Sequence, residues 1–153
     1  MFAWTDDLSV GCAILDADHK AFLDLAQLLH DSKEGGDRML VLSALAMLEE
    51  YVDGHFLREE KAMHAVEYPR LASHRMRHGL FRARIKARSE LYRQGTASAL
   101  DELAGMVVDW LRGHIRTEDA QYKNWITDSV VDGRPLGLLV IEAYGINLRQ
   151  GRR

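Results

Sequence analysis

The sequence predicts an all-α protein, an up-down-up-down antiparallel four-helix bundle with a C-terminal extension. Three observations support this fold class. The 153 residues include only two prolines, which permits long uninterrupted helices. Long segments carry apolar residues at three- and four-residue steps, which place side chains on one helical face. The connections between these segments are short, which favours antiparallel neighbours.

The first two helices are expected in the first 64 residues. The first begins at Asp16 or Asp18, either of which could be its N-cap, and ends at residues 33–37. The second covers residues 38–64 and ends before Tyr68-Pro69, because the residue before a proline avoids the helical region. Its predicted inward face is Val41, Leu45, Leu48, Val52, His55 and Glu59.

The third and fourth helices are expected over residues 71–93 and 97–125, separated by Gln94-Gly95-Thr96. The predicted inward face of the third is Leu71, His74, His78, Phe81, Ile85, Arg88 and Tyr92. That of the fourth is Leu103, Val107, Trp110, His114 and Thr117. The inward faces are apolar for most of their length and become histidine and carboxylate near one end.

Composition narrows the class of protein. With 47% hydrophobic and 28% charged residues, a disordered chain is excluded. A net charge of −3 gives no reason to expect nucleic acid as a partner. No run approaches the roughly 20 apolar residues of a membrane helix, so no membrane partner is expected. A single cysteine, Cys12, and the lack of a secretory signal predict a cytoplasmic protein.

Five of the seven histidines are expected to meet two carboxylates at one end of the bundle. In an antiparallel bundle, the starts of the first and third helices lie beside the ends of the second and fourth. The residues concerned are His19, His55, Glu59, His74, His78, His114 and Asp119. Burying each without a partner costs roughly 1–3 kcal/mol, and a bound metal removes that cost. His30 and His64 are predicted to lie outside the cluster, near helix ends.

The spacing of these residues suits two metal ions. His55/Glu59 and His74/His78 are i, i+4 pairs, so both members of each pair reach one centre. Seven ligands are too many for one tetrahedral zinc but fit two six-coordinate ions that share bridging carboxylates and keep one position open. On the fourth helix, geometry alone favours Glu118, because Asp119 is rotated about 140° from His114.

Several motifs carry a family resemblance. They are His55-Phe56-Leu57-Arg58-Glu59-Glu60, Tyr68-Pro69, His74-Arg75-Met76-Arg77-His78, residues 110–119, Trp4, Gly11 and residues 14–19. Over residues 2–126 the chain closely resembles the bacterial hemerythrins. The resemblance implies two non-haem iron ions with an oxo or hydroxo bridge, which bind O2 reversibly. It assigns the metal ligands as follows: His74, His78 and His114 on one iron, His19 and His55 on the other, and Glu59 and Asp119 as bridges.

Five apolar residues are candidates for the O2 pocket, with ordinary core packing as the alternative. Leu111 and Ile115, on either side of His114, are the best candidates by resemblance. The other candidates flank His19 and His55: Phe22, Leu23 and Phe56. Their expected role is to exclude water and protons from the bound oxygen.

The expected function is O2 binding for storage, delivery or sensing. The alternative is a di-iron redox protein that acts on peroxide or nitric oxide. The chain has no Glu-x-x-His pair of the ferritin-like oxygenases and no His-Glu-x-x-His motif. A histidine-rich ligand set also supplies less negative charge to high-valent iron, so an oxygen-binding protein is expected rather than an enzyme.

The remaining 27 residues exceed what the bundle needs. The expected division is a di-iron bundle over residues 1–126 and an extension over residues 127–153. Residues 136–146 are apolar enough to require burial, so the extension is expected to dock on the bundle or on a partner chain, as a short helix or strand. A monomer or weak homo-oligomer is expected, with a possible protein partner at this tail.

Overall fold

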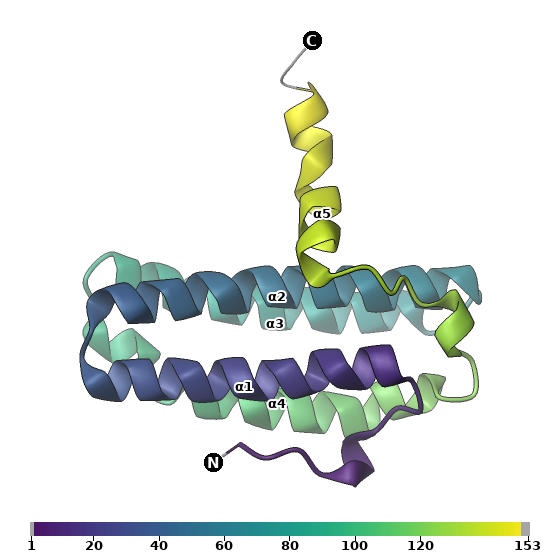
Figure 1. Cartoon of the computed structure of the whole chain (residues 1–153), viewed down its shortest axis with the longest axis horizontal. Coiled ribbons are helices and arrows are strands. Elements are labelled where there is room, and N and C mark those ends of the chain that lie inside the picture. The colour runs from purple at the N-terminus through teal and green to yellow at the C-terminus, as the bar shows by residue number, and fades with distance from the viewer. Residues whose placement is uncertain (1, 151–153) are drawn as a thin grey trace.

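The computed structural model describes residues 2–150, in which every regular element is a helix, and this confirms the all-α prediction. The long helices are α1 (Ala13–Gly35), α2 (Arg38–Ala65), α3 (Leu71–Arg93), α4 (Leu103–Thr117) and α5 (Leu136–Gln150). Four short 3-10 helices are η1 (Asp6–Leu8), η2 (Ala97–Leu100), η3 (Asp119–Tyr122) and η4 (Asp128–Val130). Figure 1 shows α1 to α4 side by side, successive helices reversing direction, with α5 projecting from the bundle.

The N-terminus of α1 differs from the prediction. The helix begins at Ala13 with Cys12 as N-cap, so neither Asp16 nor Asp18 caps it. Asp16 lies inside the first turn and accepts hydrogen bonds from the Val10 backbone N–H, at 2.8 Å, and from a serine hydroxyl of the preceding loop. Asp18 is buried. Asp16 therefore holds the preceding loop against α1, and neither aspartate caps the helix.

Helices α2 and α3 follow the predicted ranges closely. Asp37 caps α2, since its side chain accepts from two backbone N–H groups of the first turn. The predicted inward face of α2 is buried throughout. On α3, Arg88 is exposed and Ser89 is buried in its place, with its hydroxyl donating to the Ile85 carbonyl at 2.9 Å. A small hydroxyl satisfied within its own helix costs less to bury than an unpaired guanidinium.

The predicted fourth helix is divided into three pieces: η2, α4 and η3. Glu102, in the left-handed region with φ of 64°, separates η2 from α4. Thr117 ends α4 and is exposed, contrary to its predicted inward position. Trp110 is half-buried. The break after Thr117 determines which way the following carboxylates face.

Residues 136–150 form α5, whose first turns contact α2 near its middle (Figure 1). Leu136 and Leu139 are buried, whereas Leu138 and Ile141 are exposed, so the expected burial of this segment is only partial. The Ile146 side chain lies outside the described residues. Within residues 2–150, no helix is both long and apolar enough to cross a membrane.

Candidate metal centre

The structure brings all seven predicted ligands together at one end of the bundle. Each is buried, and the most accessible is His114 at 6%. The ligand atoms form two overlapping groups, and within each group all atoms lie within 4.8 Å of one another. The larger group is Glu59, His74, His78, His114 and Asp119, and the smaller is His19, His55 and Glu59. His30 and His64 are exposed and lie outside both groups.

Glu59 lies between the two groups. Its Oε1 atom is 2.7 Å from His74 Nε2 and 3.2 Å from His78 Nε2. Its Oε2 atom is 3.2 Å from His55 Nε2 and 3.8 Å from His19 Nε2. One carboxylate oxygen therefore faces each group, which is the arrangement that a bridging ligand requires.

Asp119 has the same arrangement. Its Oδ1 atom is 3.0 Å from His114 Nε2 and 3.1 Å from His74 Nε2, and its Oδ2 atom is 3.4 Å from His19 Nε2. Because α4 ends at Thr117, η3 turns Asp119 inward. Glu118, which helix geometry alone favoured, is half-buried and lies 3.4 Å from the Arg77 guanidinium instead.

The buried polar atoms of the cluster fit bound metal. Both ring nitrogens of His19 and both carboxylate oxygens of Asp119 lack a hydrogen-bond partner within the described part of the chain. The Nε2 atom of His114 lies 3.2 Å from that of His78 and 3.1 Å from that of His74. Such nitrogens repel one another unless a cation or proton lies between them. Imidazole and carboxylate together suit transition metals such as iron.

The pKa values within the cluster depend on burial and on the charged groups nearby. Burial disfavours protonated His55, but its hydrogen bonds to Asp18 and Glu59 outweigh this and raise its pKa to about 10. At His74, burial likewise disfavours the protonated ring, but the nearby carboxylates of Asp119 and Glu59 outweigh this and also raise its pKa to about 10. Burial alone would raise the pKa of Glu59, yet its histidine neighbours hold it well below its ordinary value. Metal binding must displace these histidine protons.

Sequence reasoning missed the groups that support the ligands. Asp18 accepts from His55 Nδ1 at 2.8 Å, and Glu60 accepts from His78 Nδ1 at 3.1 Å. The hydroxyl of Tyr122 donates to Glu59 Oε2 at 3.0 Å. Glu60 could have been suggested from the sequence, because it directly follows the predicted ligand Glu59. Asp18 offered none, because an aspartate near a helix start is typical of a cap.

The proposed O2-pocket residues are all buried. Phe56 stacks on His78, with ring centroids 3.7 Å apart, and Phe22 meets His55 edge-on at 5.3 Å. The remaining three pack in the core: Leu23, Leu111 and Ile115. Trp110, which was not proposed, stacks on His114 at 4.4 Å. Aromatic and aliphatic side chains therefore surround the cluster, and contact with O2 stays a prediction.

Comparison with known proteins agrees with this geometry. A family model described as the hemerythrin HHE cation binding domain matches residues 10–126. A bacteriohemerythrin of Pseudomonas paraeruginosa is 32% identical over 127 residues, covering 83% of this chain and 82% of the relative. Bacteriohemerythrins of Stenotrophomonas maltophilia and Methylococcus capsulatus are 30% and 28% identical, covering 82% and 80% of this chain and 82% and 94% of the relatives. The cluster residues lie on elements from α1 to η3, all within the matched range, and the chain belongs to the hemerythrin family.

Proposed function

We propose that this protein binds O2 reversibly at a non-haem di-iron centre, for oxygen storage, delivery or sensing. The observation that carries the proposal is the pair of carboxylates, Glu59 and Asp119, each with one oxygen toward either ligand group. Two ferrous ions held there would supply the two electrons that O2 accepts on binding. The oxo or hydroxo bridge and the assignment of three and two histidines to the two irons belong to this proposal.

The protein's own residues would make the binding reversible. Five histidines and two carboxylates supply less negative charge than a carboxylate-rich site, which disfavours high-valent iron and cleavage of O2. Phe22 packs against His55 and Phe56 stacks on His78, and these two aromatic rings exclude water from the cluster. Leu111 and Ile115 are proposed to contact the entering oxygen. The single cysteine is buried, and as part of this proposal the protein works in the cytoplasm.

The test combines iron analysis with optical spectroscopy. The purified, reduced protein is expected to hold two irons per chain and to gain an absorption band in air that disappears when O2 is removed. Glu59→Ala, which loses a ligand of both groups, is the matched control and is expected to show no such band. Absence of iron from the wild type would overturn the proposal. Rapid irreversible oxidation would overturn reversible binding and favour redox chemistry on peroxide or nitric oxide.

A further inference from the structure

A continuous set of hydrogen bonds joins the metal cluster to the C-terminal segment through Arg58. Asp18 Oδ2 accepts from His55 Nδ1 at 2.8 Å, and Asp18 Oδ1 accepts from Arg58 Nη1 at 2.5 Å. The other terminal nitrogen of Arg58 donates to the backbone carbonyl of Arg134, two residues before α5. Asp18 and Arg58 are 3% and 4% exposed, so water does not weaken the bond between them.

The inner part of this set fixes the ring of His55. When Nδ1–H donates to a carboxylate, the Nε2 lone pair is left free for a metal. That Nε2 atom already faces Glu59 Oε2 at 3.2 Å. The buried charge of Asp18 in turn needs a cation, and Arg58 supplies it.

The hydrogen bond from Arg58 to the Arg134 carbonyl depends on how α5 packs against α2. Gly54 of α2 permits close approach, because a Cβ atom there would lie 3.0 Å from Val140 Cγ2 and 3.2 Å from the Leu136 carbonyl oxygen. Lys61, two turns beyond Gly54 along α2, pairs with Asp132 at 3.0 Å. The contacts at Gly54 and Lys61, which lie before and after Arg58 along α2, hold the Arg134 carbonyl next to Arg58.

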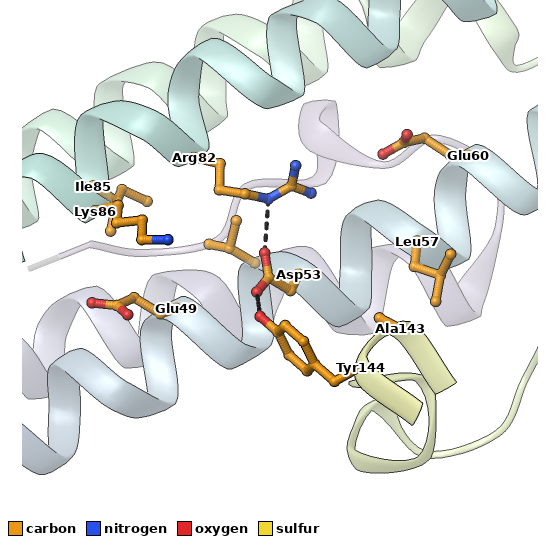
Figure 2. A pocket seen from close by; sticks show the side chains of 10 residues that line it. Glu49, Asp53, Leu57, Glu60, Arg82, Ile85, Lys86, Ala143 and Tyr144 are labelled. Atoms are coloured by element: carbon orange, nitrogen blue, oxygen red, sulfur yellow. Dashed lines mark hydrogen bonds and ion pairs between the residues drawn. The ribbon is translucent and has the colours of Figure 1, made fainter. Parts of the chain in front are cut away.

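A second attachment joins α5 to Asp53, the residue before Gly54. Figure 2 shows Tyr144 reaching from α5 to Asp53 of α2, which also pairs with Arg82 of α3 at 2.7 Å. These residues line a cavity of about 430 Å³ between α2, α3 and α5. Glu60, which holds His78 Nδ1, lies on the same cavity wall. The tail is therefore attached along the stretch of α2 that carries His55 and Glu59.

We propose that Asp18 and Arg58 are positioning residues for His55, and that residues 132–145 stabilise the metal centre through Arg58. The inference rests on the proposed function only in requiring that the cluster holds two metal ions. It gives the C-terminal segment a defined role, which is to hold the group that neutralises Asp18. Because His55 belongs to the smaller ligand group, the effect is confined to one of the two ions.

The test measures release of ferrous iron from the full-length protein to a chromogenic chelator in the absence of O2. Arg58→Met and Asp18→Asn are expected to speed release of one iron of the two by about 10- to 100-fold, the factor by which loss of such a partner typically weakens metal affinity. Release of the second iron is expected to keep its wild-type rate, whereas general loosening of the fold would speed both. Arg93→Met, which removes an ion pair with Glu49 elsewhere on α2 and α3, is the matched control.

The tail is tested by displacing α5 in the full-length chain. Gly54→Leu is expected to speed release of the same iron by a smaller factor and to have no further effect in the Arg58→Met background. Lys61→Met loosens the tail from the other side and replaces Gly54→Leu if that variant does not fold. Additive effects of the tail and Arg58 substitutions would overturn the role of the tail.

The outcomes separate this inference from the proposed function. Wild-type release rates in Arg58→Met and Asp18→Asn would overturn the positioning role while leaving O2 binding untouched. A wild type that holds two irons but does not bind O2 reversibly would overturn the proposed function and leave this test valid.

Discussion

Both ends of the four-helix bundle bury some side chains completely, but they bury different kinds of side chain. At the end where α2 begins, Leu45 and Leu48 are inaccessible and pack with other apolar side chains such as Leu29 and Leu103. Three turns further along the same face of α2, Glu59 is just as inaccessible. The first end gains free energy from burial, whereas the second loses free energy unless its charges are compensated.

This difference separates stability from function along one helix. The apolar end needs no ligand to fold, because its residues exclude water by packing alone. The polar end contains orphaned buried atoms at His19 and Asp119, and metal is the natural compensation. Changes at the two ends should therefore have different signatures in unfolding and in metal content.

Metal removal is expected to have the largest effect and to act on one end. Chelation removes a ligand that stabilises the native state by about 4 kcal/mol when free metal exceeds its Kd a thousandfold. Hydrogen exchange is expected to show lost protection around His55, His74 and His114, with protection retained around Leu45 and Leu48. A uniform loss of protection along α2 would contradict the separation of the two ends.

Substitution of Asp119, which we propose as a bridging ligand, is expected to have the next largest effect. Asp119→Ala removes the carboxylate whose Oδ1 atom faces His114 and whose Oδ2 atom faces His19, so iron content should fall below two per chain. Glu118→Ala is the control, because that side chain points toward Arg77 and should leave two irons bound. If Glu118→Ala loses iron and Asp119→Ala keeps it, then Glu118 rather than Asp119 faces the cluster, and the break in the helix after Thr117 is contradicted.

Leu48→Ala tests the apolar end. Truncating this fully buried side chain is expected to cost about 2–5 kcal/mol of unfolding free energy, since it leaves a cavity. Denaturant unfolding measures the loss, and iron analysis of the folded variant should still give two irons per chain. A folded Leu48→Ala protein with depleted iron would mean that the two ends are coupled.

Much of the candidate site follows from helix geometry. A 3.6-residue turn brings His55 to Glu59 and His74 to His78, and antiparallel packing brings these pairs to one end. The position of Asp119 does not follow in this way, because it depends on α4 ending at Thr117. A continuous helix would have turned this carboxylate about 140° away from His114.

The supporting contacts depend on tertiary packing, which local patterns do not encode. Asp18 has the residue type and position of a cap, and only the packing of α1 on α2 makes it a partner of His55 and Arg58. The angle at which α5 leaves the bundle depends on a close approach at Gly54. Both features involve residues that are far apart in sequence, so periodicity could not reveal them.

The smallest expected effect concerns one hydrogen bond at the polar end. Tyr122 is fully buried and donates to Glu59 Oε2 at 3.0 Å. Burial and the charges of Asp119 and Glu59 hold its pKa well above the ordinary value, so the hydroxyl stays a donor at neutral pH. Tyr122→Phe keeps the ring and its edge contact with Tyr68 while removing only that donor.

The expected cost of Tyr122→Phe is about 1 kcal/mol of unfolding free energy, with two irons still bound, because Glu59 keeps its histidine neighbours and the metal. Denaturant unfolding of the loaded and metal-free forms measures this cost in both states. It should be greater in the metal-free form, where no cation compensates the charge on Glu59 Oε2. An equal cost in both forms would mean that metal does not share this oxygen, and Glu59 would then not bridge the two groups.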